Sequence, residues 1–158
     1  MLCITNQDQR YFVIFGIFII SLSLDFIVAH VADAKYFAIM ADETTDVSQK
    51  EQMTLVIRYV DKDLVVREDF LGFVQITDLT GRALADMILG CLKRMHIDCS
   101  YLVGQGYDGA AAMSRIYNGV QALVKEKYPL ATYVHCASHC LNLKLEMHRV
   151  FCLRLSTS

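Results

Sequence analysis

The sequence predicts an α/β domain built around a mixed five-stranded sheet. The first observation is the stretch Phe37–Asp46, an apolar run that ends in three acids within five positions. A run without polar alternation is typical of a central strand that is covered on both faces. The other two observations are the strand-like stretches that follow it and the alternation of helix-like and strand-like stretches after residue 80. Together they predict the order strand, strand, strand, helix, strand, helix, strand, helix.

The three leading strands are expected to form an antiparallel meander. The first strand leaves the core at Asp42, and a polar loop follows it. Met53–Val60 places its side chains on two faces with a period of two residues. The polar turn Asp61–Asp63 reverses the chain, and Leu64–Val74 is the third strand. A connection this tight makes the second and third strands an antiparallel hairpin.

Helices and strands alternate in the rest of the chain. Apolar residues from Ala83 to Met95 recur with the 3.6-residue period of a helix lying on a sheet, and Asp78 or Thr80 can cap its start. Because a helix intervenes, the next strand can lie parallel to the first. The remaining predicted elements are a strand over Cys99–Gly104, a helix over Asp108–Lys127 that Gly119 can split and Pro129 ends, a strand over Ala131–Cys136 and a helix over Ala137–Leu145.

This order, an antiparallel meander ahead of a parallel βαβαβ tail, is that of the ribonuclease H-like fold. In that topology the first strand is central and the fourth lies beside it, so Asp42 and Asp108 should converge. Paired carboxylates at neighbouring strand ends suit two-metal phosphoryl transfer, because Mg²⁺ and Mn²⁺ prefer oxygen ligands. The structural alternative makes Asp42 a turn former and Asp108 a helix N-cap.

The segment Gly104–Gly109 also satisfies G-x-G-x-x-G, a dinucleotide-binding fingerprint, between a predicted strand and a predicted helix. Two features count against it. The strand over Thr132–Cys136 ends without the acid that would bind a ribose, and Asp108 would face a pyrophosphate. An antiparallel hairpin ahead of the motif is also unusual for that fold. A dinucleotide-binding domain is therefore the less favoured alternative.

A second motif places four soft metal ligands within six positions at the end of the fifth strand: His135, Cys136, His139 and Cys140. A closed structural zinc site normally joins two separated pairs of ligands. Only Cys3 and Cys152 remain as distant partners for such a pair. We therefore expect a packed corner between strand and helix here, and no zinc.

Length, charge and cysteine placement indicate one ordered domain with reduced thiols and without a strongly basic surface. At 158 residues the chain suits one domain, and 54% apolar residues exclude disorder. The formal net charge of −2 excludes the basic surface that a self-sufficient nucleic-acid binder carries. Among the six cysteines, Cys91 falls in an apolar helical stripe and Cys99 begins a strand, so we expect reduced thiols rather than a disulfide framework.

An apolar run over residues 11–31 favours a different class of protein. It is uncharged for 14 residues before Asp25 interrupts it, whereas a membrane-spanning helix needs roughly 20 residues. With Arg10 ahead of it the run also resembles a signal peptide, although no small-x-small cleavage site follows closely. The alternative function is thus a membrane-associated or purely structural product with idle acids. A core or interfacial helix is the simpler interpretation of the run.

Three ordered segments of the chain resemble the hAT superfamily of DNA transposases and the animal proteins derived from it. The likeness covers residues 33–145. The segments are Asp33–Asp46 with the following Lys50–Gln52, then Gly106–Ser114, and finally His135-Cys136-x-x-His139-x-Leu141-Asn142-Leu143.

The resemblance implies a ribonuclease H-like core whose Asp-Asp-Glu triad binds Mg²⁺ and cuts transposon ends. Asp42 matches the first acid and Asp108 the second, while Cys136 and His139 match a Cys-x-x-His motif that follows the fifth strand. The third acid of the family lies far downstream, beyond a helical insertion. Glu146 is the low-ranking candidate for it in this chain. DNA as partner, homo-oligomers among the full-length relatives and a nuclear location are also implied.

The sequence therefore predicts a truncated, inactive hAT-type fragment with a partial ribonuclease H-like fold. Residues 1–32 form a divergent apolar segment, residues 33–145 the core and residues 146–158 a divergent tail. Two carboxylates should bind Mg²⁺ or Mn²⁺ weakly, and without a third ligand phosphoryl transfer should be slow or absent. Membrane association through residues 11–31 remains the alternative of a different class.

Overall fold

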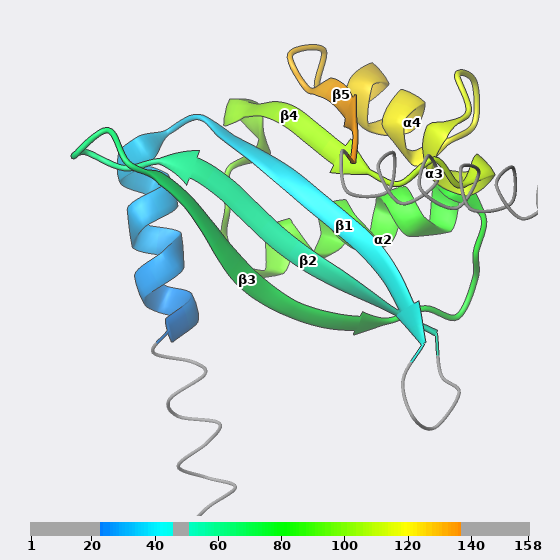
Figure 1. The fold of residues 1–158 in the computed structure, drawn as a ribbon, viewed down its shortest axis with the longest axis horizontal. Helices are drawn as coiled ribbons and strands as arrows, with labels where there is room; N and C mark the ends of the chain where they lie inside the picture. The colour runs from blue at the N-terminus through cyan, green and yellow to red at the C-terminus, as the bar shows by residue number, and fades with distance from the viewer. Residues whose placement is uncertain (1–22, 46–50, 137–158) are drawn as a thin grey trace, which may run out of the picture.

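Five strands form one mixed sheet in the order β3-β2-β1-β4-β5 (Figure 1). The computed structural model describes residues 23–45 and 51–136. β1 pairs antiparallel with β2 and parallel with β4, and β2 and β3 are antiparallel while β4 and β5 are parallel. This arrangement confirms the predicted α/β class and the meander with its parallel tail. The strands are β1 Phe37–Thr45, β2 Glu51–Val60, β3 Val66–Gln75, β4 Leu102–Tyr107 and β5 Thr132–His135.

The two faces of β1 have different environments. Phe37 and Ile39 are buried in a core that helix residues such as Leu84, Ile88 and Val124 complete. Their neighbours Ala38 and Met40 line a cavity on the opposite face. Within residues 23–45 and 51–136 the helices contribute to the first face, so the expectation that β1 is covered on both faces holds there for one face only. The alternation of two faces along a strand produces this asymmetry.

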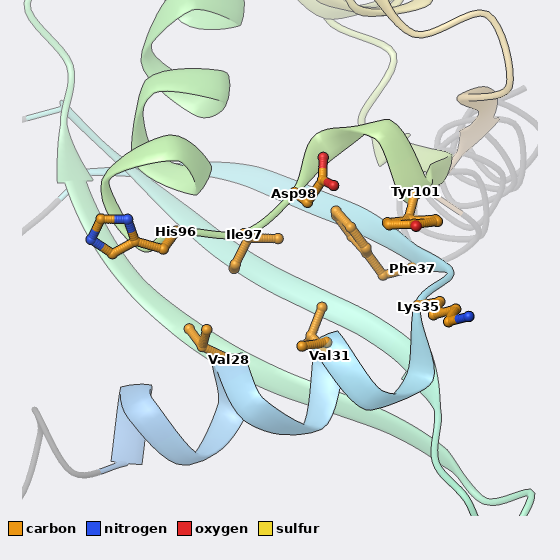
Figure 2. Close-up of a pocket in the computed structure, with 9 residues that line it drawn as sticks. Val28, Val31, Lys35, Phe37, His96, Ile97, Asp98 and Tyr101 are labelled. Carbon is orange, nitrogen blue, oxygen red and sulfur yellow. The ribbon is translucent and has the colours of Figure 1, made fainter.

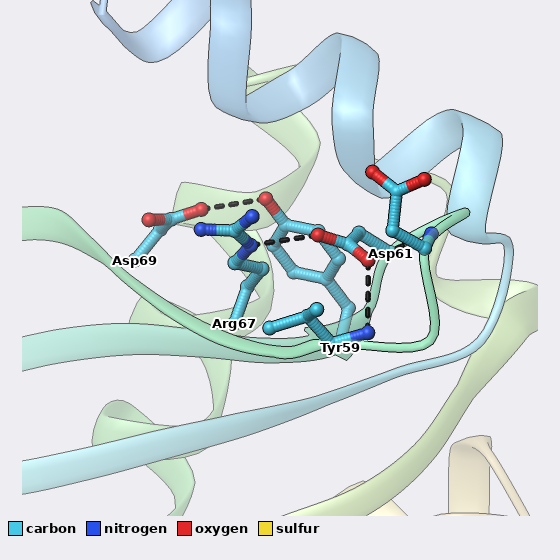
Figure 3. Close-up of polar contacts among 6 residues, drawn as sticks. Tyr59, Asp61, Arg67 and Asp69 are labelled. Atoms are coloured by element: carbon cyan, nitrogen blue, oxygen red, sulfur yellow. Dashed lines mark hydrogen bonds and ion pairs between the residues drawn. The ribbon is translucent and has the colours of Figure 1, made fainter.

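The β2–β3 hairpin is held by polar side chains at its turn (Figure 3). Oδ1 of Asp61 accepts hydrogen bonds from the backbone N–H groups of Asp63 and Val65, and Nε of Arg67 donates to Oδ2 of Asp61 at 2.7 Å. The Tyr59 hydroxyl donates to Oδ2 of Asp69 at 2.6 Å. Burial, and after it this hydrogen bond, raises the pKa of Tyr59 to about 12, so the phenol stays protonated in the fold.

A bulge in β3 brings two aromatic side chains to the same face. Leu55 of β2 pairs with Gly72 and Val56 with Phe70, which leaves Leu71 as the extra residue. Gly72 has φ of 144°, a conformation that residues with a side chain rarely adopt. Phe70 and Phe73 consequently contact each other edge to face, with ring centroids 5.0 Å apart. Bulges of this kind also disrupt the pairing edge that an outer strand presents.

Helix α2, Gly81–Arg94, confirms the most regular periodicity in the sequence. The Thr80 side chain accepts a hydrogen bond from the Ala83 N–H and so satisfies a donor of the first turn. Leu84, Ile88 and Leu92, spaced by four residues, are fully buried against the sheet. The helix ends where His96 adopts φ of 59° and its N–H bonds to the carbonyl of Lys93, as in a Schellman cap.

In the second half the bounds of β4 differ from those predicted, whereas the predicted split of a helix at Gly119 is confirmed. Cys99–Tyr101 is a short 3₁₀ turn, because the Asp98 carboxylate accepts the Ser100 N–H, and β4 starts at Leu102 rather than Cys99. The predicted helix over Asp108–Lys127 is two helices, α3 Ala111–Ser114 and α4 Val120–Lys127. The break falls at Gly119, where a Cβ would lie 2.6 Å from the Arg115 carbonyl oxygen and is therefore excluded.

The described part of the N-terminal apolar run is a helix over residues 23–34. In the described part of the chain no helix combines the length and apolarity needed to cross a bilayer. Residues 11–22 of the run and the predicted helix over Ala137–Leu145 lie outside the described residues. A cavity of about 140 Å³ separates this helix from the segment that follows α2, with Val31, Phe37 and Ile97 among its lining residues (Figure 2). It lies at the start of β1, away from the end that carries Asp42.

Candidate functional site

Asp42 and Asp108 lie just beyond the parallel-paired part of two neighbouring strands. Asp42 is still inside β1, which continues to Thr45 and pairs Asp42 with Thr54 of β2, so the expectations that the strand leaves the core at Asp42 and that Asp42 forms a turn are wrong. Met40 of β1 pairs with Gly106 of β4, and each aspartate lies two residues beyond that pair. Both aspartates line one cavity of about 490 Å³ on the open face of the sheet. The strand order predicted from the sequence thus brings the two carboxylates to a common site.

Two glycines of β4, Gly104 and Gly106, form part of the floor of this cavity. A Cβ at Gly104 would lie 2.9 Å from the Cβ of Ala38, and a Cβ at Gly106 would lie 3.3 Å from Cγ of Met40. Both glycines lie inside β4 and allow close packing against β1, whereas a dinucleotide fingerprint needs them in the turn between strand and helix. The glycine pattern therefore reflects strand packing and does not support the dinucleotide-binding alternative.

The Asp108 carboxylate is oriented by its own turn. Oδ1 of Asp108 accepts a hydrogen bond from the Ala110 N–H at 3.1 Å, and the Asp108 carbonyl accepts one from the Tyr133 hydroxyl at 3.1 Å. The residue at the N-cap of α3 is Ala110, so Asp108 stabilises the turn before this helix and does not cap it. The alternative prediction that Asp108 is a helix N-cap is therefore wrong. The Asp108 side chain lies at the cavity.

Negative charge is concentrated around the two aspartates. Burial raises the pKa of the Glu43 carboxyl, and the negative charges of Asp108, Glu51 and Asp42 raise it further. An excess of nearby carboxylates has this effect because each one disfavours ionisation of the next. A divalent cation would relieve the repulsion, and carboxylate oxygens are ligands that Mg²⁺ and Mn²⁺ prefer.

Among the described residues, Asp42 and Asp108 are the two carboxylates at this cavity that could hold such a cation. Within residues 23–45 and 51–136, no group of three or more His, Cys, Asp or Glu side chains is arranged to hold a metal ion. The donor set of Asp42 and Asp108 thus fits a hard cation whose other ligands are water or substrate oxygens. Glu146 and His139, the other candidates from the sequence, lie outside the described residues.

The Cys-His motif is described only in its first half. His135 is the last residue of β5, and Cys136 follows it, with its backbone N–H bonded to the Tyr107 carbonyl at 2.8 Å. Both residues line the cavity that contains the aspartates. The zinc alternative also needs His139 and Cys140, which are outside the described part. Of the other thiols in the described part of the chain, Cys91 and Cys99 are buried and free.

His135 is a residue whose place in the site the sequence did not indicate. Its Nε2 is buried and has no hydrogen-bond partner in the described part of the chain. A Cβ built at Gly109 would lie 2.8 Å from Cε1 of His135, so the imidazole packs directly against the turn that follows Asp108. The signal for this contact in the sequence is Gly109, directly after the second acid, which also fits the dinucleotide motif.

The strand order and the paired acids define an α/β domain of the RNase-like class. Residues 19–119 match the family model DUF4371, described as "ZMYM1/FAM200, RNase-like domain". The match covers more than half of the chain, and the chain belongs to this family. The resemblance to transposase-derived proteins is thereby confirmed.

Curated relatives agree with this assignment. The chain is 29% identical over 118 residues to the human 52 kDa repressor of the inhibitor of the protein kinase and 28% identical over 112 residues to the mouse protein of that name. These matches cover 73% and 71% of this chain and 15% of each relative. The bovine general transcription factor II-I repeat domain-containing protein 2 is 32% identical over 92 residues, which is 58% of this chain and 10% of that protein.

Proposed function

We propose that this domain descends from the catalytic core of a hAT-type DNA transposase and retains a two-carboxylate site for Mg²⁺ or Mn²⁺. The main support for this proposal is the register between β1 and β4, which brings Asp42 and Asp108 to one cavity. The ancestral role of such a site is metal-dependent cleavage and transfer of DNA strands. We expect the two carboxylates to bind the cation together with water or substrate oxygens.

The residues of this chain would act mainly by positioning. The parallel pairing of β1 with β4 sets the separation of the two carboxylates, and the Ala110 N–H orients Oδ1 of Asp108. The glycine floor at Gly104 and Gly106 leaves room above the sheet for a substrate. A cation bound there would supply Lewis-acid activation of the attacking oxygen and stabilisation of the leaving oxygen.

DNA is the macromolecular partner of this proposal, and the nucleus its location. The names of the relatives, a repressor and a general transcription factor repeat-domain protein, support a nuclear context. A net charge of −2 means that DNA affinity would depend on a local basic patch or on other parts of a longer protein. Homo-oligomers, as the transposase resemblance implies for full-length relatives, belong to the same proposal.

Thermal unfolding with Mn²⁺ tests the site. We expect Mn²⁺ to raise the melting temperature of the wild-type domain, because binding to the folded state at roughly 100 times Kd adds about 2.7 kcal/mol of stability. Asp42→Asn and Asp108→Asn should each abolish this shift, because a neutral amide is a poor ligand for a hard cation.

Asp86→Asn is the matched control, since Asp86 is an exposed carboxylate on α2 and does not line the cavity. This variant should keep the full Mn²⁺ shift. Equal shifts in the wild type and in both site variants would overturn the proposed cation site.

A further inference from the structure

The turn after the second acid is held from outside by strand β5. The Tyr133 hydroxyl donates to the carbonyl of Asp108 at 3.1 Å, and the Cys136 N–H donates to the carbonyl of Tyr107 at 2.8 Å. Asp108 directly follows the last residue of β4, so the direction of its carboxylate depends on the backbone of Asp108 and Gly109. Contacts made by β5 and by Cys136 after it therefore help to set the direction of the Asp108 carboxylate.

His135 adds a contact at the next position of this turn. A Cβ at Gly109 would lie 2.8 Å from Cε1 of His135, closer than Cβ atoms approach other atoms in folded proteins, and 3.0 Å from its Nε2, so either the ring or the turn would have to shift. The imidazole thus occupies the space that any side chain at position 109 would need. Its Nε2 is buried without a hydrogen-bond partner among the described residues, although His135 lines the same cavity as Asp42 and Asp108.

We infer that His135 is a positioning residue for the Asp108 carboxylate, acting through its packing against Gly109. The turn is then fixed at three points: Oδ1 of Asp108 by the Ala110 N–H, the Asp108 carbonyl by Tyr133 and the Gly109 backbone by His135. Residues that orient a metal ligand typically change metal affinity roughly 10–100-fold when they are removed. The inference rests on the proposed cation site, which it deepens.

His135 acts through Asp108 and not as a third ligand. In the described part of the chain no set of three His, Cys, Asp or Glu side chains is placed to share a metal ion, and Asp42, Asp108 and His135 are no exception. The close approach of the ring is to Gly109, whose lack of a side chain permits it. A glycine at 109 and an imidazole at 135 are therefore predicted to work as a pair.

A double-mutant cycle between the two positions tests this pairing. Gly109→Ala should weaken Mn²⁺ binding roughly 10-fold or more, because the new methyl group displaces the turn against the ring. In a His135→Ala background the ring is gone, and Gly109→Ala should then change Kd by less than about 2-fold. Kd is measured by electron paramagnetic resonance of free Mn²⁺, and Thr132→Ala, an exposed change on the same strand, should leave it unaltered.

A second readout uses the metal-free protein. The Ala110 amide, which donates to Oδ1 of Asp108, should shift in the NMR spectrum of His135→Ala and in that of Gly109→Ala, whereas adding Gly109→Ala to His135→Ala should cause little further shift. If Gly109→Ala alone fails to fold, the double variant should fold again, because the clash is removed. Absence of Mn²⁺ binding in the wild type would refute the proposed site but leave this readout intact. Equal effects of Gly109→Ala with and without His135, in both readouts or in folding, would overturn the inference.

Discussion

At the scale of single residues, the pKa of Glu43 responds to the negative charges of the candidate site. Glu43 follows Asp42 in β1, is half-buried, and has its carboxyl pKa raised by burial and then by the charges of Asp108, Glu51 and Asp42. A carboxyl whose folded pKa exceeds its unfolded value stabilises the fold only while it is protonated. This stabilisation is fully present below about pH 4.5, which is the ordinary pKa of a glutamate. It is lost as the pH rises through the pKa of Glu43 in the folded state.

Glu43→Gln should therefore stabilise the domain at pH 7 by a few tenths of a kcal/mol, the usual size of a partly solvated charge term. The gain should shrink towards zero at pH 4, where the wild-type carboxyl is itself largely neutral. Urea unfolding at both pH values measures the difference. Glu68→Gln is the control, because Glu68 pairs with Arg58 at 3.1 Å and gains nothing from neutralisation. A larger gain at pH 4 than at pH 7 would contradict this account.

At the scale of elements, helix α2 contains two glycines with opposite roles. Gly81 lies at the first position of the helix, where a Cβ would run into the carbonyl oxygens of Asn118 and Ala112 in the α3–α4 region. Gly90 lies in the helix interior, and the nearest atom to its Cβ would be Nη1 of Arg94 at 3.5 Å, an ordinary contact. The first glycine permits close packing between helices, whereas the second only lowers the helix propensity.

Gly81→Ala should consequently destabilise the domain by about 1–3 kcal/mol, because the methyl group overpacks a junction of backbone atoms. Gly90→Ala should instead stabilise it by roughly 0.5–1 kcal/mol through helix propensity. Chemical unfolding followed by circular dichroism gives both values. Similar changes of the same sign in the two variants would show that the α2–α3 junction is looser than the structure indicates.

At the scale of the whole molecule, the β1–β4 pair joins the antiparallel half of the sheet to the parallel half. Phe37 pairs with Leu102 and Ala38 with Gly104, so the register shifts by one residue at the start of this pair. Gly104 then lies so close to Ala38 that no Cβ fits between the strands. The same pair carries the two aspartates at its far end, which makes the strand separation important for both stability and the site.

Gly104→Ala should lower the free energy of unfolding by about 1–3 kcal/mol, because the two strands must separate to admit a methyl group. It should also reduce the Mn²⁺-dependent shift, since Asp42 and Asp108 move with their strands. Combining it with Ala38→Gly frees the space and should recover most of both losses. Thermal unfolding with and without Mn²⁺ measures the two effects together. A double variant no better than Gly104→Ala alone would count against the close packing.

The sequence by itself determined the element order, the paired strands of the meander, helix α2 and the convergence of Asp42 with Asp108. These features follow from local periodicity and from strand topology, which are both written in the order of apolar and polar residues. The family resemblance likewise depended on short ordered motifs, and the match over residues 19–119 bears it out.

Tertiary structure alone decided the features that depend on contacts between distant residues. The start of β4 moved to Leu102 because Asp98 stabilises a 3₁₀ turn, and Gly104 and Gly106 proved to be strand residues packed on β1. The approach of His135 to Gly109 is a contact across 26 positions. No periodicity encodes such contacts, because they arise only when the strands pair in register and place their side chains at a common site.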